Sequence, residues 1–337
     1  MVKLKINLQN GYNIYVGQNL LQNLSQCFNL QRKVLIITDD GVPSKYSKMV
    51  ESNCLQSKIF VFPQGEKSKN IKTLENILTA MSEFNMDRTD CVVAVGGGVV
   101  GDISGLASSL YMRGIDFYNV PTTLLSQVDS SIGGKTAVDF NGIKNLMGAF
   151  YQPKGVVIDV STLSTLDDRQ FSNGISESVK MALTSDNKLF ERLEGYSYQE
   201  IKQNIQSIII DSLTIKKKIV EKDEKEKGLR RMLNFGHTIG HAIESQKDFE
   251  LYHGECVAIG MVAMSGEKIR QRVISILQKL NLPTTCTCDK ENIMELIKHD
   301  KKTISNIVKA VVVNQIGKGK IEEISLTELS KRVYENF

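Results

Sequence analysis

The chain has 337 residues and a formal net charge of +4, with 41% apolar and 24% charged residues. This length is enough for two domains with their own cores, and the composition is that of a globular protein. The weak positive charge gives no ground for a nucleic-acid partner, and no apolar run is long enough to cross a membrane. The six cysteines form no Cys-x-x-Cys pair, which favours a reducing compartment, so we expect a cytoplasmic protein.

The first half of the chain alternates strand patterns with helix patterns. Strands are predicted over residues 1–8, 33–39, 59–62 and 91–95. Between the last two, apolar residues recur at helical spacing from Leu74 to Met81. Such alternation predicts a mostly parallel sheet with helices on its faces. Ligands of these sheets bind outside the carboxyl ends of the strands, which places Asp39 and Gly65-Glu66 at the binding edge.

A glycine run, Gly96-Gly97-Gly98-Val99-Val100-Gly101-Asp102, follows the strand at 91–95 directly. It matches GxGxxG, a pattern in which the backbone approaches a phosphate and helix N-terminal amides point at it. Alone the match is weak, because glycine runs are common in turns, but the strand before it and the helical pattern after it add weight. Asp116 is a poor match for the acidic residue that usually completes the pattern, and Asp39 and Asp102 are better placed.

Residues 111–150 are dense in glycine, hydroxyl and cationic side chains. Gly133-Gly134-Lys135-Thr136 offers flexible amides beside a point charge, which together can build an anion site, although the Walker spacing is absent. The alternative is a long surface loop, and such loops are usually functional or disordered. The segment is too apolar for disorder. Val156–Asp159 then predicts the last strand of the first domain, so we expect domains at 1–160 and 161–337.

The second half shows long helical patterns until about residue 307, where a small hairpin is predicted. Glu177 and Lys180 are three residues apart on one helix face, and spacing alone favours an ordinary surface ion pair. The mixed charge run from Ile215 to Lys227 is expected to be a solvated helix face.

Three of the four histidines, His237, His241 and His253, fall close together in the chain. His237 and His241 are four apart and share one face of a predicted helix, and Arg230 and Asn234 extend this polar stripe at spacings of four and three. Imidazole is the commonest metal ligand and titrates nearest neutral pH. The cluster therefore indicates a metal site, an acid/base site or both, with unrelated histidines as the alternative.

Six longer motifs span the chain. They are GGGVVGD at 96–102, PTTLLSQVDSSIGGKTA at 121–137, GIKN at 142–145, SESVK at 176–180, GLRRMLNFGHTIGHAIE at 228–244 and HGECVAIGM at 253–261. In order and spacing they resemble the 3-dehydroquinate synthases. The resemblance implies an α/β fold: an N-terminal Rossmann-like domain that binds NAD, a mainly α-helical C-terminal domain that supplies metal and substrate groups, and an active site in the cleft between them.

The resemblance also implies a reaction, the second step of the shikimate pathway. The substrate 3-deoxy-D-arabino-heptulosonate 7-phosphate becomes 3-dehydroquinate and phosphate, through transient oxidation by NAD, phosphate elimination, reduction and intramolecular aldol closure. The alternatives are another sugar phosphate cyclase such as 2-deoxy-scyllo-inosose synthase, a metal-dependent polyol dehydrogenase, and, least favoured, a nucleotide-binding module without activity.

Residue roles follow from the resemblance, position by position in the motifs. The ligands of Zn²⁺ or Co²⁺ would be Glu177, His237 and His253. Catalytic roles would fall to Asp129, Lys135, Lys180, Glu226 and His241, the last two as proton-transfer groups. The substrate contacts would be Arg113, Asp129, Lys135, Asn145, Lys180, Lys216, Arg230, Asn234, His253 and Lys302, with Lys301 as the alternative to Lys302. The NAD contacts would be Asp39, Glu66, Lys69, Gly97, Gly98, Val99, Asp102, Thr122, Thr123, Lys135, Lys144, Thr162 and Thr165. Arg113 matches a residue that reaches a neighbouring subunit's site, which implies a homodimer.

Overall fold

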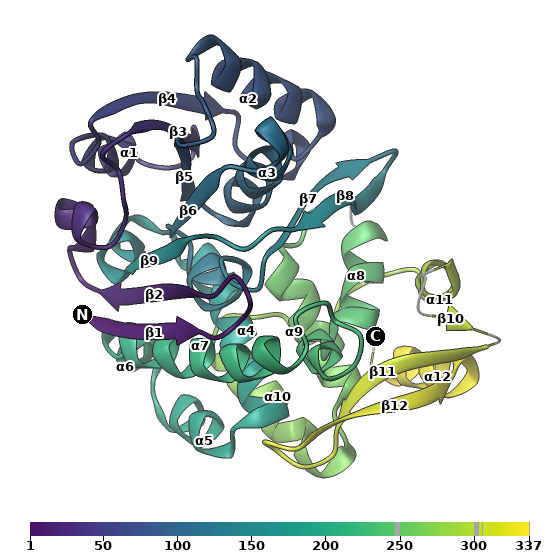
Figure 1. The fold of residues 1–337 in the computed structure, drawn as a ribbon. Coiled ribbons are helices and arrows are strands. Elements are labelled where there is room, and N and C mark those ends of the chain that lie inside the picture. Colours follow the sequence, from purple (N-terminus) through teal and green to yellow (C-terminus); the bar gives the residue numbers. More distant parts are fainter. Residues whose placement is uncertain (247–249, 300–302, 305, 337) are drawn as a thin grey trace. The chain divides into compact units, whose positions relative to one another are not determined.

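The computed structural model describes residues 1–246, 250–299, 303–304 and 306–336. The chain divides into two compact units, Met1–Asp167 and Asp168–Phe337, drawn from purple to teal and from teal to yellow in Figure 1. The division falls at residue 167 rather than near residue 160, because the short helix η5 (Val160–Thr165) is tied to the N-terminal unit. The Tyr46 hydroxyl donates to the Thr162 carbonyl at 3.2 Å, and the Gln127 amide donates to the Thr162 hydroxyl at 3.0 Å.

A seven-stranded sheet organises the N-terminal unit, in the order β1-β2-β9-β6-β5-β3-β4. The strands are β1 (Val2–Ile6), β2 (Tyr12–Gly17), β3 (Lys33–Asp39), β4 (Gln56–Phe62), β5 (Cys91–Gly96), β6 (Asp116–Pro121) and β9 (Gly155–Asp159). Only β1 and β2 pair antiparallel, and the other neighbours are parallel. The predicted mostly parallel sheet is thus confirmed.

Helices cover both faces of this sheet, which explains why its central strands are apolar throughout. Leu35 and Ile37 of β3 pack with α2 (Ile71–Glu83) and α3 (Gly98–Leu110). Val34 and Ile36, which point to the opposite face, pack with η1 (Leu20–Gln26) and α1 (Ser44–Glu51). Successive side chains of a strand alternate between faces, so one apolar run fills two cores.

The segment 111–150 is not a long loop, and that interpretation was wrong. It contains η3 (Tyr111–Arg113), β6, a π-helical turn η4 (Ser126–Ser130) and the hairpin β7 (Lys135–Phe140)–β8 (Ile143–Phe150). The hairpin turns at Asn141-Gly142, whose φ angles are +51° and +74°. Asn-Gly adopts this left-handed pair readily and is a strong hairpin signal, so the sequence did contain the information.

The C-terminal unit is mainly helical. Its helices are α4 (Asp168–Ser185), α5 (Asn187–Gly195), α6 (Tyr198–Gln203), α7 (Ile205–Lys222), η6 (Leu229–Asn234), α8 (His237–Gln246), α9 (His253–Met264), α10 (Glu267–Lys279), α11 (Lys290–His299) and α12 (Leu326–Asn336). An antiparallel sheet of β10 (Thr303–Ile304), β11 (Ile307–Val313) and β12 (Gly319–Ser325) includes the predicted hairpin. Within the described ranges, no helix has the length and apolar character of a membrane span.

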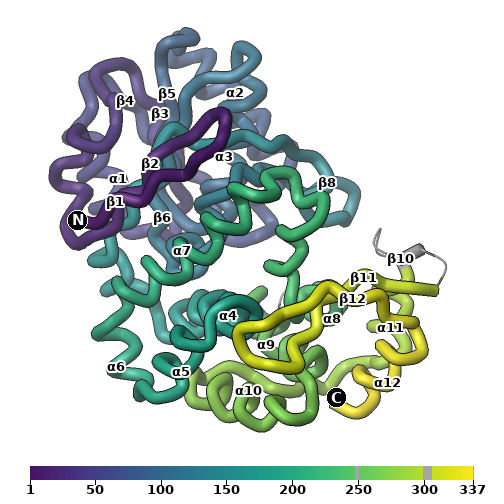
Figure 2. The backbone as a smooth tube through the Cα atoms, turned by 60° about the horizontal axis from the view of Figure 1, so that its bottom comes forward, coloured from purple at the N-terminus to yellow at the C-terminus, as the bar shows by residue number. Residues whose placement is uncertain are grey.

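Helix α9 lies at the centre of this unit, beside α4, α8 and α10 (Figures 1 and 2). It is buried from Gly254 to Met264, as expected for a helix that is apolar on all sides. Glycines let α8 approach it closely: a Cβ on Gly260 would lie 2.0 Å from the Gly236 carbonyl oxygen. Because α9 packs against both α4 and α8, the first residues of α8 and α9 lie near the middle of α4.

Candidate functional site

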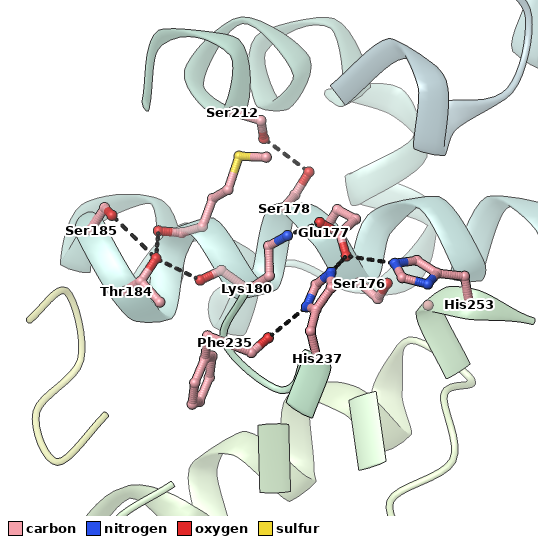
Figure 3. A network of polar contacts seen from close by, with 12 residues as sticks. Ser176, Glu177, Ser178, Lys180, Thr184, Ser185, Ser212, Phe235, His237 and His253 are labelled. Carbon is pink, nitrogen blue, oxygen red and sulfur yellow. Dashed lines mark hydrogen bonds and ion pairs between the residues drawn. The ribbon is translucent and has the colours of Figure 1, made fainter. Parts of the chain in front are cut away.

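Glu177, His237 and His253 lie together in the C-terminal unit, each offering a ligand atom within 4.8 Å of the others. They come from α4, the first residue of α8 and the first residue of α9. Both Nε2 atoms face Glu177 Oε1, at 4.0 Å from His237 and 3.8 Å from His253 (Figure 3). These distances are too long for hydrogen bonds. Glu177 Oε1 is buried and has no hydrogen-bond partner among the described residues, so the three groups fit a shared cation.

The second ring nitrogen of each metal-facing histidine has its own partner. Nδ1 of His237 lies 3.1 Å from the Phe235 carbonyl oxygen, and Nδ1 of His253 lies 3.4 Å from Glu244 Oε2. Burial, aided by the charge of Lys180, lowers the pKa of His237 well below its ordinary value, which keeps the ring in the neutral form that binds metals. Burial also acts to lower the pKa of His253, but the hydrogen bond and charge of Glu244 raise it above its ordinary value.

The Glu177–Lys180 pair is buried, so its interpretation as a surface ion pair was wrong. The side chains are 0% and 1% exposed, and Lys180 Nζ contacts Glu177 Oε2 (Figure 3). The reason is that α4 packs against both α7 and α9 and is buried from Phe171 to Thr184. Buried charges persist only when they are paired. The lysine therefore engages one carboxylate oxygen and leaves the other toward the histidines.

The predicted polar stripe from Arg230 to His241 does not lie on one helix. Residues 229–234 form the separate 3-10 helix η6, and the chain turns at Gly236, with φ of +79°, before α8 begins at His237. A left-handed glycine ends one helix and allows the next to start in a new direction. Spacing across this turn therefore carried no information about a shared face.

His241 lies one turn after His237 and is exposed. Its ring centroid is 5.1 Å from that of His237 and 5.8 Å from that of His253. It does not belong to the Glu177 group, and instead forms a second possible ligand group with Glu244 and His253. The structure thus separates the two histidines that spacing had paired: one faces Glu177, and the other borders the same cluster from the exposed side.

The loop after α7 brings together cationic and acidic side chains. Lys216 on α7 and Arg230 on η6 are 4% and 3% exposed, so the interpretation of the charge run as a solvated helix face was wrong for Lys216. Arg230 donates to the Glu224 carbonyl, and Asn234 Nδ2 donates to Glu226 Oε1 at 2.5 Å. Arginine and lysine form strong charge-assisted hydrogen bonds with anions, so these two buried cations are suited to an anion site.

Asp223 shapes this loop, and sequence reasoning missed it. Its carboxylate accepts hydrogen bonds from the amides of Lys227, Gly228 and Arg230, at 2.8, 2.7 and 3.0 Å. An aspartate that accepts hydrogen bonds from nearby backbone amides is a turn signal, and Asp223 lies at the C-terminal end of α7, before the turn that leads to η6. The surrounding charge run obscured that signal.

In the N-terminal unit, the predicted NAD residues follow the carboxyl ends of parallel strands. Asp39 ends β3, Glu66 and Lys69 follow β4, Gly97 to Asp102 follow β5, Thr122 and Thr123 follow β6, and Thr162 and Thr165 follow β9. Asp39 Oδ1 accepts hydrogen bonds from the amides of Gly41 and Val42 at 3.0 and 3.1 Å, and burial raises the pKa of the Asp39 carboxyl group. The N-cap of α3 is Gly97, which has no side chain with which to cap the first amides of the helix, as is common where a helix N-terminus binds an anion.

Lys69 connects several of these positions. It is 5% exposed, and its Nζ lies 2.7 Å from Asp102 Oδ2, 3.8 Å from Glu66 Oε1 and 2.5 Å from Asn145 Oδ1. Burial acts to lower its pKa, but the charges of Asp102 and Glu66 raise it above its ordinary value. Asn145 lies in the β7–β8 hairpin, so this lysine ties the hairpin to the glycine-run helix.

The remaining predicted residues are placed as follows. Asp129 lies on η4, Lys135 is exposed at the start of β7, and Lys144 lies half-buried on β8. Arg113 is exposed on a turn with φ of +69°. Lys301 and Lys302 lie outside the described residues.

Comparison with known proteins agrees with these motifs. Family models described as 3-dehydroquinate synthase N-terminal and C-terminal match residues 59–173 and 174–303. The 3-dehydroquinate synthase of Clostridium acetobutylicum is 40% identical over 342 residues, which covers 96% of each chain.

Solved structures agree in fold. A 2-deoxy-scyllo-inosose synthase, in complex with carbaglucose-6-phosphate, NAD⁺ and Co²⁺, matches with a TM-score of 0.90 at 24% identity over 100% of both chains. The 2-epi-5-epi-valiolone synthase of Streptomyces hygroscopicus, with NAD⁺ and Zn²⁺ bound, matches with a TM-score of 0.89 at 28% identity over 99% of this chain and 98% of the other. The family models and the full-length sequence match lead to one conclusion: this chain belongs to the 3-dehydroquinate synthase family.

Proposed function

We propose that this protein converts 3-deoxy-D-arabino-heptulosonate 7-phosphate to 3-dehydroquinate and phosphate, with NAD as a recycled cofactor and Zn²⁺ or Co²⁺ as the metal. Family membership supports the reaction. The chemistry is supported above all by one observation. His237 and His253 face Glu177 Oε1, a buried carboxylate oxygen that has no hydrogen-bond partner among the described residues. Two histidines and one carboxylate leave positions for substrate oxygens, as a catalytic metal site requires.

A metal held by Glu177, His237 and His253 would supply Lewis acidity toward a substrate hydroxyl, and bound NAD would supply reversible hydride transfer. The protein's own side chains do the rest. His241 is exposed beside the metal group and exchanges protons with the substrate, and Glu226 serves as a further proton acceptor. Lys180 and Asp129 bind substrate hydroxyls, and a conformer held for aldol closure gains from proximity.

The cationic residues Lys216 and Arg230 are suited to bind the phosphate group of the substrate. Lys216 and Arg230 are both buried, and charge-assisted hydrogen bonds from such cations to phosphate are strong. Asn234, Asn145, Lys135 and Lys302 complete the proposed substrate contacts. Net redox is zero over the cycle, and the enzyme is a lyase because the net reaction eliminates phosphate.

For NAD, the amides at the start of α3 are proposed to bind the pyrophosphate, since helix N-termini favour anions. Asp39 is proposed to accept a ribose hydroxyl. Most of the other proposed contacts follow the carboxyl ends of strands in the same sheet: Glu66, Lys69, Gly97, Gly98, Val99, Asp102, Thr122, Thr123, Thr162 and Thr165. The last two, Lys135 and Lys144, lie in the separate β7–β8 hairpin.

We propose further that the protein is a cytoplasmic homodimer in which Arg113 reaches the neighbouring subunit's site. All six cysteines are free thiols, which suits a reducing compartment. Met112, Arg113 and Gly114 all have positive φ, at +48°, +69° and +118°. Strained backbone of this kind persists where a side chain must be presented in a fixed direction. Sedimentation of the purified protein tests the dimer, and a monomer at assay concentration would refute it.

The test of the reaction is phosphate release from the heptulosonate phosphate with a catalytic amount of NAD, with and without a chelator. Release that depends on both metal and NAD, without accumulating NADH, is expected. Release from a hexose 6-phosphate instead would favour another cyclase, and accumulating NADH would favour a dehydrogenase. No release from the metal-replete protein would refute the proposal.

A further inference from the structure

Glu244 lies on the α8 face that carries His237 and His241, at helical spacings of seven and three. It is 6% exposed, and it has no role among the ligands and catalytic groups described above. Its Oε2 lies 3.4 Å from Nδ1 of His253, the first residue of the neighbouring helix α9. We infer that Glu244 is a positioning residue, whose carboxylate orients His253 for metal binding.

The argument rests on the two nitrogens of the His253 ring. Nε2 faces Glu177 Oε1 at 3.8 Å, and Nδ1 faces Glu244 at 3.4 Å. A carboxylate beside Nδ1 holds the ring proton on that nitrogen, which leaves the Nε2 lone pair free toward the cation. The same contact limits rotation of the ring, so Nε2 stays aimed at the metal group.

His237 provides an internal comparison. Its Nδ1 is held by the Phe235 carbonyl oxygen at 3.1 Å, a neutral acceptor fixed by the backbone. His253 is held instead by a charged side chain from a different helix. Glu244 therefore links α8 to His253 on α9, and its charge makes His253 a better electron donor to the metal. The neutral Phe235 carbonyl has only a weak effect of this kind on His237.

Glu244 also falls in a second group with His241 and His253 that has metal-ligand geometry. A cation in that group would leave Glu177 Oε1 buried and without a hydrogen-bond partner among the described residues. A cation in the Glu177 group satisfies that oxygen. The geometry therefore favours Glu244 as the partner of a ligand over Glu244 as a ligand.

This inference rests on the proposed metal site, and the experiment separates the two. Zn²⁺ affinity is measured by competition with a chromogenic chelator for the unsubstituted protein, Glu244→Gln, Glu244→Ala and His253→Ala. Glu267 is an exposed residue of the same unit, and the variant Glu267→Gln controls for the loss of one negative charge. Co²⁺ absorption spectra at saturation report whether the ligand set is intact, and far-UV circular dichroism reports folding.

We expect Glu244→Ala to weaken Zn²⁺ binding by roughly 10- to 100-fold, with a smaller loss in Glu244→Gln, which keeps an acceptor but not the charge. The Co²⁺ spectrum should keep its form in both, and Glu267→Gln should bind normally. If both Glu244 variants bind Zn²⁺ normally while His253→Ala does not, only this inference fails. The inference would also be overturned if the Co²⁺ spectrum of Glu244→Gln indicated one ligand fewer than that of the unsubstituted protein. Normal binding by His253→Ala would instead refute the proposed ligand set.

Discussion

Gly254 controls how closely α9 approaches α4, and the change Gly254→Ala is the most direct test of the metal site's geometry. An added Cβ would lie 2.1 Å from the Asn173 carbonyl oxygen and 2.3 Å from Ser176 Oγ, both on α4. The Gly254 amide also donates to Asn173 Oδ1 at 2.6 Å. These contacts join the residue after one proposed ligand, His253, to the residues before another, Glu177.

The size of the effect follows from the clash. A backbone oxygen cannot rotate away, so the start of α9 must move from α4 by about 1 Å, at an overpacking cost of roughly 1–3 kcal/mol. Alanine's helix propensity offsets up to about 1 kcal/mol of that cost. The net loss of stability is therefore small, but the two ligands separate. We expect the Kd for Zn²⁺ to rise at least about tenfold, as when groups supporting a metal site are altered.

Gly195→Ala is the matched control, because Gly195 ends α5 and a Cβ there meets nothing within 4 Å. Zn²⁺ affinity is measured by chelator competition. Thermal midpoints are followed by far-UV circular dichroism, since the chain has no tryptophan, and are compared as midpoints because two units need not unfold in one step. Equal Zn²⁺ affinity in Gly254→Ala and Gly195→Ala would refute the reasoning.

Three further predictions address other parts of the chain. His237→Ala is expected to abolish Zn²⁺ binding, whereas His241→Ala should keep the metal and lose rate; equal metal loss in both would contradict the ligand assignment. Lys69→Met removes the partner of Asp102, and we expect the KM for NAD to rise at least about tenfold, or roughly 1.4 kcal/mol, with normal Zn²⁺ affinity; an unchanged KM would remove Lys69 from the proposed NAD site. Cys91 is fully buried, and burial raises the pKa of its thiol to about 12, so peptide mapping should find it alkylated by iodoacetamide only after unfolding in urea; labelling of the folded protein would contradict its placement in β5.

Much of the fold was predictable because it depends on local patterns. Apolar runs and alternation located β1, β3, β4, β5 and β9, and the hairpin of β11 and β12. The strand β2 was missed although Ile14 and Val16 are β-branched and Tyr12, Ile14 and Val16 alternate in burial with Asn13 and Tyr15. The hairpin β7–β8 was missed because its Asn-Gly turn was not used. In both cases the signal was present in the sequence, so these were errors of interpretation.

The site was only partly predictable for a different reason. Spacing found the histidine cluster, and the family resemblance named Glu177 as its partner, but the distance between α4 and α9 depends on packing at Gly254. Spacing also misled, since it treated Arg230 to His241 as one helix across the turn at Gly236. Helical spacing describes neighbours only while the helix continues.

By itself, the sequence determined the mostly parallel sheet, the helical second half and the concentration of histidines, because each follows from periodicity and residue type. Tertiary structure alone decided which charges are buried. Glu177 and Lys180 would have the same spacing on a solvated helix, yet packing of α4 between α7 and α9 removes both from water. That burial pairs one carboxylate oxygen with the lysine and aims the other at two histidines from different helices, and no local pattern can specify contacts between segments so far apart in the chain.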